Sequence, residues 1–550
     1  MKLNERIAIT TTVLIFLLIC VAPSIAEWGE TARDFIRLPL MSDAEICSDG
    51  NGGCWVASSP VGLCHVDRSG NVTWGDTALI IPPARSYDPR PVLADNGDVI
   101  LAMETYNNEE DRQRVYLQRF NLDGEYVWGE EGINLDTSRL NQHLAGAYPG
   151  PVDDTYLIHW DRAGEDNHPL IQLINGDGES LWGVGGFELN WTHSNSHFAL
   201  TSDQCYIVAQ NVPDTPAIEI IKIDPDGEFL WDLRLSTLAE NIRQRSLRGA
   251  ESDRLGGAVL IYEYERRITI DNVLRRYYGI NAIRVSDEGD SLWTTHLYER
   301  EKEPQGDRYG EIDPIINYAG SGRFFVAWAD NAHTFQAAAF DVEGELFWEE
   351  PVDVITSDVG YTTLAAVDSD GAVCYIWRQI DDPHMGGRPQ QWGQRISLDG
   401  ERLWGDHGRA VQARNVSGRS IVTDGNGGMI TVVDGFPTIQ MMNRNGEIGV
   451  VLEVGIDGNF DKLDPKKLSP HLHIYPNPAN SMTTLSFSRP FNQNMTLKFY
   501  DLQGRLLLNN LIHPGVSAHP LDISTFPTGN YILQTKSGKT TSSQTLQILK

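Results

Sequence analysis

Hydrophobic and polar positions alternate between glycine-marked turns in a unit that recurs eight times along the chain. Its clearest copy is L-D-G-E-Y-V-W-G, from Leu122 to Gly129. A glycine follows an acidic or small polar residue, and in seven copies a tryptophan follows four positions later. The glycines are Gly70, Gly124, Gly178, Gly227, Gly289, Gly344, Gly400 and Gly446, and the tryptophans are Trp74, Trp128, Trp182, Trp231, Trp293, Trp348 and Trp404, with Val450 in the eighth place. Because a tight turn between strands needs positive φ, each copy predicts a β-hairpin.

The rest of each unit predicts four short strands. A second turn leads into a fully apolar strand, as in D-N-G-D-V-I-L-A-M from Asp95. A strand such as V-Y-L-Q-R-F precedes the signature turn, and a shorter one such as G-I-N-L follows the tryptophan. A glutamine recurs six residues before the turn glycine, at Gln118, Gln172, Gln394 and Gln440. We expect this glutamine to satisfy backbone groups between strands.

The length of the unit indicates the fold. Counted from Trp28 to Val450, the positions of the signature tryptophan are spaced by about 53 residues on average, and units of this length with four strands are typical of propeller blades. In pairs such as Leu181–Trp182, two neighbouring strand residues are both large and apolar, which predicts burial on both faces. The fold class is therefore all-β, a β-propeller of about eight four-stranded blades, with seven as the alternative. Trp28-Gly29 looks like the end of a repeat, so we expect an N-terminal strand to complete the eighth unit.

Changes in composition divide the chain into four segments. Residues 1–26 resemble a signal peptide, with basic Lys2 and Arg6, an apolar run and a small-residue cleavage site ending at Ala26. Residues 27–455 hold the repeats, and the polar residues 456–470 are expected to form a linker. Residues 471–550 predict a small β-sandwich. No other apolar run is long enough to span a bilayer, so we expect no membrane span after removal of the signal.

The charge distribution excludes one class of partner. The net charge is −31, and because residues 468–550 and 1–26 are both slightly basic, residues 27–467 carry −36. Such a field repels nucleic acid. One stretch reverses this charge with Arg243, Arg245, Arg248, Arg254, Arg266, Arg267, Arg275 and Arg276. We favour a solvated loop that pairs with Glu251, Glu263 and Glu265; the alternative is a site for an anion or carboxylate at the mouth of the ring.

Five cysteines remain after residue 26, and an odd number forbids complete pairing. Cys205 and Cys374 lie within apolar runs, where buried thiols are common. Cys47, Cys54 and Cys64 are close in sequence, and one pair of them could form a disulfide. Their spacing does not match that of a zinc site.

The tail carries several motifs in a fixed order. They are Tyr475-Pro476-Asn477-Pro478, Tyr500-Asp501 with Gly504-Arg505, Leu521-Asp522, Gly529-x-Tyr531 after Pro527, and the terminal Lys550. The tail closely resembles the type A C-terminal sorting domain of the type IX secretion system, over about 80 of the 550 residues. One departure is Asn530, where an apolar residue is usual. The resemblance implies an Ig-like sandwich recognised by the type IX secretion machinery, with the protein secreted or held at the outer cell surface.

Candidate chemistry in the repeats is sparse. The sequence Asp-x-Asp-Gly at Asp224 to Gly227 is similar to calcium loops, but its acidic run stops early, so we expect plain hairpin turns and no cofactor, with calcium as the alternative. The segment Asp67 to Trp74 is similar to the Asp-box of sialidase-type propellers, although its tryptophan is one residue late and its leading serine is absent. The sequence contains no G-x-S-x-G motif, so nothing indicates a serine nucleophile of that kind. His471 and His473 share a strand face, where a structural role is favoured over a metal site.

Two functions remain open, and the sequence identifies no catalytic residue. The first hypothesis is a non-enzymatic binding or scaffold protein whose variable loops meet a protein or glycan ligand. The second is a secreted carbohydrate-active hydrolase or lyase similar to sialidases. The second predicts carboxylates from different blades that converge in the axial channel, roughly 5–9 Å apart.

Overall fold

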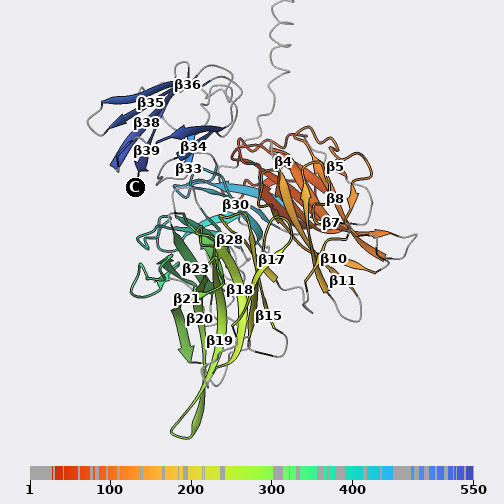
Figure 1. The fold of residues 1–550 in the computed structure, drawn as a ribbon, viewed down its shortest axis with the longest axis vertical. Helices are drawn as coiled ribbons and strands as arrows, with labels where there is room; N and C mark the ends of the chain where they lie inside the picture. Colours follow the sequence, from red (N-terminus) through yellow and green to blue (C-terminus); the bar gives the residue numbers. More distant parts are fainter. Residues whose placement is uncertain are drawn as a thin grey trace, which may run out of the picture. The chain divides into compact units, whose positions relative to one another are not determined.

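The computed structural model describes residue 28, residues 31–449 and residues 472–548, apart from short gaps in connecting loops. The expected signal peptide (1–26) and linker (456–470) lie outside the described residues. The chain divides into two compact units, Met1–Val451 and Leu452–Lys550. The described residues form strands and turns (Figure 1), and none of them forms a helix that could cross a bilayer.

The described part of the first unit forms eight antiparallel sheets of four strands each, which we call blades one to eight. Blades one and two contain β2 (Ser42–Ser48), β3 (Cys54–Ser59), β4 (Gly62–Val66) and β5 (Leu79–Ile80), then β6 (Ser86–Leu93), β7 (Val99–Asn107), β8 (Arg112–Phe120) and β9 (Ile133–Asn134). Blades three and four contain β10 (Gln142–Pro149), β11 (Thr155–Arg162), β12 (His168–Asn175) and β13 (Phe187–Glu188), then β14 (Ser196–Leu200), β15 (Tyr206–Asn211), β16 (Ile218–Ile223) and β17 (Phe229–Leu235).

The remaining blades follow the same strand order, and only the last borrows a strand from elsewhere in the chain. Blades five and six contain β18 (Ile242–Ser252), β19 (Ala258–Ile270), β20 (Val273–Val285) and β21 (Ser291–Glu301), then β22 (Ile315–Tyr318), β23 (Arg323–Ala329), β24 (Phe335–Asp341) and β25 (Val352–Asp353). Blades seven and eight contain β26 (Thr363–Val367), β27 (Val373–Gln379), β28 (Gln390–Ile396) and β29 (Arg409–Gln412), then β30 (Gly418–Thr423), β31 (Met429–Val433), β32 (Thr438–Met442) and β1 (Ile36–Arg37).

Apolar packing between blades closes the sheets into a ring. Eight buried apolar clusters each join two consecutive blades, and one of them joins blade eight to blade one through residues such as Ile430 and Ile46. The N-terminal β1 pairs with β32, with Ile36 opposite Ile439. The predicted eight-bladed propeller, completed by an N-terminal strand, is confirmed.

The signature tryptophans connect each blade to the next. Each indole Nε1 donates a hydrogen bond to the carbonyl oxygen two residues before the turn glycine of the following unit, at 2.7–3.3 Å. The pairs are Trp28–Arg68, Trp74–Leu122, Trp128–Gly176, Trp182–Pro225, Trp231–Asp287, Trp293–Val342, Trp348–Leu398 and Trp404–Arg444. The first pair shows that Trp28 takes the place that Val450 leaves unfilled, so the sequence of eight bonds is complete around the ring.

The turn glycines leave room for these indoles. A Cβ on Gly446 would lie 2.7 Å from Cδ1 of Trp404, and one on Gly289 would lie 2.9 Å from Cδ2 of Trp231. The same glycines have positive φ, +75° and +89°, which side chains disfavour. Glycine is therefore required twice at this position, by the turn and by the neighbouring ring.

The residue before each tryptophan corrects one expectation. Leu181, Leu230 and Leu403 were expected to be buried together with their tryptophans, but 39–50% of their surface is exposed. Because neighbouring strand residues point to opposite faces, only the tryptophan meets the next blade. The prediction of burial on both faces is wrong for this position.

The recurring glutamines satisfy backbone groups, as expected. Gln172 donates to the carbonyl of Gly183 at 2.7 Å and accepts from the amide of Trp182 at 3.0 Å. Gln394 likewise donates to the carbonyl of Gly405 at 2.6 Å and accepts from the amide of Trp404 at 2.9 Å. The side chain thus holds the segment after the turn against the third strand.

Blade five differs from the loop predicted for its arginine-rich stretch. The arginines lie mostly on β18, β19 and β20, and the β19–β20 hairpin continues beyond both neighbouring strands (Figure 1). Pairing with glutamates is found: Arg248 with Glu263 at 3.0 Å and Arg267 with Glu265 at 2.5 Å. Glu251 has no such ion pair among the described contacts. Strands replace the loop because β-branched and aromatic residues, such as Ile268, Ile270, Tyr277 and Tyr278, stand beside the arginines on both sides of the Asp271-Asn272 turn.

The second unit has two sheets around one core. The first sheet orders β33 (Leu472–Tyr475), β34 (Met482–Phe487) and β37 (Ala518–Asp522), and the second orders β36 (Leu506–Ile512), β35 (Met495–Asp501), β38 (Gly529–Ser537) and β39 (Thr540–Ile548). Leu485 and Leu521 from the first sheet share a buried cluster with Leu497, Phe499 and Leu533 from the second. The Ig-like assignment of this unit stays a prediction.

The glycine requirement can be tested with a matched pair. Gly446→Ala and Gly405→Ala both place a side chain at positive φ, but a Cβ on Gly405 meets nothing within 4 Å. Both changes cost the strain of positive φ, about 1 kcal/mol. We expect Gly446→Ala to lower the free energy of unfolding by roughly 1–3 kcal/mol more, because Trp404 must move. Urea unfolding followed by tryptophan fluorescence measures the difference, and equal losses would contradict this account.

The role of Trp28 in closing the ring gives a second prediction. We expect Trp28→Ala to remove a buried contact worth about 3 kcal/mol and to loosen blade eight against blade one. Hydrogen exchange should then rise at β1, β32 and β2 more than elsewhere. Trp74→Ala is the control, because it weakens an interface within the continuous chain. Closure by Trp28 is wrong if both variants raise exchange at β1 and β32 equally.

Candidate binding pocket

The first strand of each blade lies nearest the axis of the ring. First strands of successive blades contact one another, as β2 contacts β6 and β30, and β18 contacts β14 and β22. Five of the eight first strands pair with their second strands through a bulge, namely β2, β6, β10, β18 and β30. A bulge turns a side chain away from the regular alternation, so the inner strands can present polar groups that the hairpins cannot.

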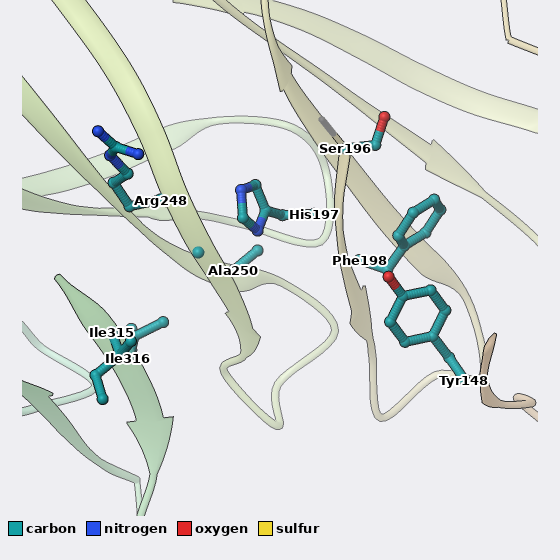
Figure 2. A pocket seen from close by; sticks show the side chains of 9 residues that line it. Tyr148, Ser196, His197, Phe198, Arg248, Ala250, Ile315 and Ile316 are labelled. Atoms are coloured by element: carbon teal, nitrogen blue, oxygen red, sulfur yellow. The ribbon is translucent and has the colours of Figure 1, made fainter. Parts of the chain in front are cut away.

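A pocket of about 220 Å³ opens between the first strands of blades three to six (Figure 2). Its lining is Tyr148 on β10, Ser196, His197 and Phe198 on β14, Arg248, Gly249 and Ala250 on β18, and Ile315 and Ile316 on β22. A Cβ on Gly249 would lie 2.8 Å from Cγ2 of Ile316, so this glycine allows β18 and β22 to approach. The lining combines an aromatic side, an apolar side and a few polar groups.

The aromatic side of the pocket is formed by a stack of rings. Phe198 lies 5.1 Å from Tyr148 and 5.0 Å from the buried His159, measured between ring centroids. Such tilted ring pairs hold each other in place. Burial raises the pKa of Tyr148 and lowers the pKa of His159 to about 4. Both rings are therefore neutral near pH 7.

The polar side of the pocket carries one positive charge. Figure 2 shows His197 and Arg248 on neighbouring strands. Burial, followed by the charge of Arg248, lowers the pKa of His197 to about 4, so its imidazole is neutral near pH 7. The Arg248 guanidinium is held by Glu263 at 3.0 Å. The hydroxyl of Ser196 is buried and has no hydrogen-bond partner within the described structure.

Other polar groups near the inner strands are already engaged. Arg90 pairs with Glu45 at 3.2 Å, and Glu104 accepts a hydrogen bond from the amide of Leu144 at 2.8 Å. Glu104 also lies 3.6 Å from Nδ1 of His143. Burial raises the pKa of Glu104, and His143 opposes this shift. These carboxylates are not part of the pocket lining.

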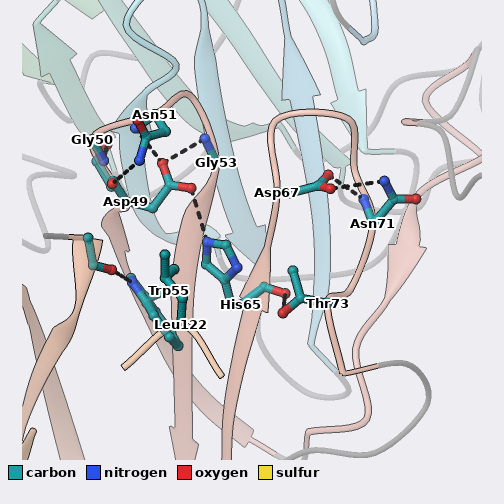
Figure 3. A network of polar contacts seen from close by, with 12 residues as sticks. Asp49, Gly50, Asn51, Gly53, Trp55, His65, Asp67, Asn71, Thr73 and Leu122 are labelled. Atoms are coloured by element: carbon teal, nitrogen blue, oxygen red, sulfur yellow. Dashed lines mark hydrogen bonds and ion pairs between the residues drawn. The ribbon is translucent and has the colours of Figure 1, made fainter. Parts of the chain in front are cut away.

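The aspartates of the hairpin turns have a structural use. Asp67 accepts hydrogen bonds from the amides of Ser69 and Asn71 at 2.8 and 2.9 Å, and Asp49 binds the amides of Asn51 and Gly53 as well as His65 (Figure 3). The Asp-box-like segment is thus a side-chain-stabilised turn.

The turn at Asp224 to Gly227, whose sequence is similar to calcium loops, uses its aspartate in the same way. Asp224 accepts from the amides of Asp226 and Glu228, at 3.0 and 2.8 Å. No group of three or more His, Cys, Asp or Glu side chains is placed to hold a metal ion in the part of the chain that the structure describes. The calcium alternative is not tested by this and stays a prediction.

The five cysteines among the described residues are free thiols, including the three for which a disulfide pair was considered. Cys205 and Cys374 are buried, as expected. Cys54 and Cys64 lie in the cluster between blades eight and one, where burial raises the pKa of Cys64 to about 12. Thiols held in the protonated form by burial are unreactive, so these cysteines serve in packing.

Sequence reasoning named Arg248 and missed the rest of the pocket. Tyr148, Ser196, His197 and Phe198 lie on first strands, which have no repeated motif and are poorly patterned. The seven signature tryptophans, which were predicted as motif residues, are distributed around the ring, one at each of seven blade interfaces. None of them lines the pocket. The available signal was the unusual sequence H-S-N-S-H-F at residues 193–198, which mixes histidine and serine with an aromatic residue and whose last three residues begin β14.

The sorting motif is described in part. Tyr531 is buried and donates from its hydroxyl to the carbonyl of Pro527 at 2.8 Å. Its ring stacks on Phe499 with centroids 5.0 Å apart. Gly529 begins β38, Tyr500 and Asp501 end β35, Tyr475 ends β33, and Arg505 is exposed before β36. Pro476, Asn477, Pro478 and Gly504 lie outside the described residues.

Several solved structures resemble the chain at low identity. The β-propeller domain of the Trilobed protease from Pyrococcus furiosus is 10% identical, with a TM-score of 0.37, and the match covers 65% of this chain and 94% of that one. The BP39L lectin from Burkholderia pseudomallei is 10% identical, with a TM-score of 0.36, covering 65% and 95%. The Hadza microbial sialidase Hz136 is 11% identical, with a TM-score of 0.28, covering 71% and 73%. A comparison with curated proteins gives no match.

The tail matches a known family model. Residues 473–549 match the secretion system C-terminal sorting domain, within the segment that the motifs indicated. The resemblance to the type IX sorting domain is confirmed. The protein is therefore exported through the type IX secretion machinery, to the cell surface or beyond it.

Proposed function

We propose that this protein is an exported binding module, and that its ligand enters the pocket between blades three and six. The ligand group that fits best combines an apolar ring face with a carboxylate or another hydrogen-bond acceptor, as an acidic sugar does. Phe198 and Tyr148 supply the aromatic surface, and Arg248, which is paired with Glu263 at 3.0 Å, supplies further N–H donors of its guanidinium. A pocket that is mainly apolar with a few convergent polar groups is the usual form of a small-ligand site.

The observation that carries this proposal is the composition of the pocket lining. Glycoside hydrolysis ordinarily uses two carboxylates, about 5–9.5 Å apart. None of the nine described lining residues is an aspartate or a glutamate. The histidine is neutral and the arginine is held by Glu263, so the lining can orient a ligand but offers no acid–base pair. This composition supports binding over a hydrolase that uses two carboxylates; it does not bear on a sialidase-like enzyme, whose nucleophile is a tyrosine.

The unpartnered hydroxyl of Ser196 also supports a bound polar group. A buried polar atom without a partner costs about 1–3 kcal/mol. A ligand or an ordered water that bonds to Ser196 Oγ would remove this cost. Because the serine hydroxyl can donate and accept, it can form a hydrogen bond with a sugar hydroxyl in either role.

The test is a glycan array probed with the exported protein, with neutral and carboxylate-bearing glycans side by side. We expect retention of carboxylate-bearing glycans. For a retained glycan, Arg248→Lys should weaken the affinity at least about tenfold in calorimetry, because an ammonium cannot reproduce the planar guanidinium contact. Arg276→Ala is the control, since this arginine lies on the same blade outside the pocket.

Two results would contradict the proposal. One is a folded protein that retains no glycan and shows no heat with carboxylate ligands. The other is the appearance of a cleaved sugar, by mass spectrometry, in the wild type and its loss in the variant. Melting temperatures of both variants should stay close to that of the wild type, because Arg248 and Arg276 are only partly buried.

The buried histidine predicts a dependence on acid. The folded-state pKa of His197 is about 4, below the value of about 6.5 expected in the unfolded chain. Its contribution to stability is therefore fully present above about pH 6.5 and is lost as the pH falls through 4. We expect the wild type to lose about 1–2 kcal/mol more than His197→Gln between pH 7 and pH 4.5. Urea titrations at the two pH values measure this, and parallel losses would show that His197 is protonated without cost.

A further inference from the structure

One row of exposed apolar side chains remains unexplained by the ring. In units two to seven, the residue before the signature tryptophan is large, apolar and 39–50% exposed. These residues are Val127, Leu181, Leu230, Leu292, Phe347 and Leu403. Each tryptophan that follows contacts the turn of the next unit, so the six positions succeed one another as a continuous arc around the ring.

Each apolar residue of the arc has two acidic neighbours at the same turn. Carboxylates stand immediately before and after the turn glycine in all six units, and all twelve are exposed. The pairs are Asp123 and Glu125, Asp177 and Glu179, Asp226 and Glu228, Glu288 and Asp290, Glu343 and Glu345, and Asp399 and Glu401. We call these eighteen side chains, twelve acidic and six apolar, the turn arc. Its surface is acidic and apolar at the same time, repeated six times.

The fold does not need an apolar residue at this position. The backbone amide there donates to the third strand of its own blade, as Val127 does to Arg119 at 2.8 Å. In units one and eight the residue is Thr73 and Gly449, and both make the same bond at 3.0 Å. Because an outward strand position is ordinarily polar, six large apolar residues there indicate a second role.

We propose that the turn arc docks a protein surface that is basic and carries exposed apolar side chains. The charge of the arc excludes the other occupants. Anionic lipid headgroups and nucleic acid would meet twelve carboxylates. A second copy meeting the arc face to face would place like charges against each other, which is unfavourable. A basic partner gains both electrostatic attraction and apolar burial, which matches the two kinds of side chain.

The arrangement also sets the form of the partner. Six equivalent turns in a row offer the same contact repeatedly, so an extended or repetitive partner can bind several turns at once. Each contact is weak because it is exposed, and binding depends on their combination. This partner site is separate from the pocket, whose lining shares no residue with the turn arc.

The experiment uses the exported protein and three synthetic peptides of twelve residues, measured by fluorescence anisotropy in about 50 and 150 mM salt. One peptide alternates lysine and leucine, the second alternates lysine and serine, and the third alternates glutamate and leucine. We expect the lysine–leucine peptide to bind at least about tenfold more tightly than the lysine–serine peptide of equal charge. The glutamate–leucine peptide should not bind.

A charge-neutral variant separates the turn arc from the general acidity of the protein. Val127→Ser, Leu181→Ser, Leu230→Ser, Leu292→Ser, Phe347→Ser and Leu403→Ser are combined in one chain. This variant should bind the lysine–serine peptide as the wild type does and should lose the preference for lysine–leucine. Because the replaced side chains are exposed, the melting temperature should stay close to that of the wild type. If the combined variant unfolds, the triple variant of Leu181, Leu230 and Leu292 provides the same comparison with half the arc.

Three outcomes would overturn the proposal. The first is equal affinity of the wild type for the lysine–leucine and lysine–serine peptides, which would mean that charge alone acts. The second is an unchanged preference in the serine variant, which would place the apolar contact elsewhere. The third is self-association of the wild type in sedimentation that the serine variant abolishes, which would make a second copy the occupant.

Discussion

The contact between a signature tryptophan and the next turn glycine sets the geometry of the ring. The indole donates to the following turn and fills the space that the absent Cβ leaves, as Trp404 does at Gly446. A hydrogen bond fixes direction, and the aromatic contact fixes distance, so each blade determines where the next one begins. Apolar burial between blades supplies most of the stability, but burial has no direction of its own. The hydrogen bond of the repeated tryptophan supplies that direction.

Closing such a ring poses a particular problem at its ends. The last unit has lost its tryptophan, and the strand order of blade eight is completed from the other end of the chain, by Ile36 and Arg37. Trp28 makes the missing indole bond to the turn of unit one, at 2.8 Å. The interface between blades eight and one, which no direct chain connection spans, is thereby held by the same contact as the others. Both Trp28 and the two-residue strand β1 join the N-terminal segment of the described chain to the ring.

The repeats allowed the blade count, the closing strand and the role of the glutamines to be predicted from the sequence. Repetition made this possible, because eight copies of one turn separate a structural requirement from chance. Comparison of the units with one another could not reveal the pocket. Its residues, such as His197 and Phe198, lie on the first strands, which carry no motif that repeats from unit to unit, so comparison of the units gives no signal there. The burial of Leu181 was mispredicted for a different reason: Trp182 takes the face that meets the next blade, so the neighbouring leucine lies on the opposite face.

Structure and function are thus assigned to different positions of the same unit. The glycine, present in all eight copies, and the tryptophan, present in seven, build the ring. Positions that vary without pattern, on the first strands of blades three to six, line the pocket. The residue before the tryptophan belongs to neither class, because it is apolar in six consecutive units and yet faces solvent. Thr73 and Gly449 occupy this position in units one and eight and show that the turn forms without a large apolar side chain. An apolar residue that recurs without a structural need is best explained by repeated contact with a partner protein.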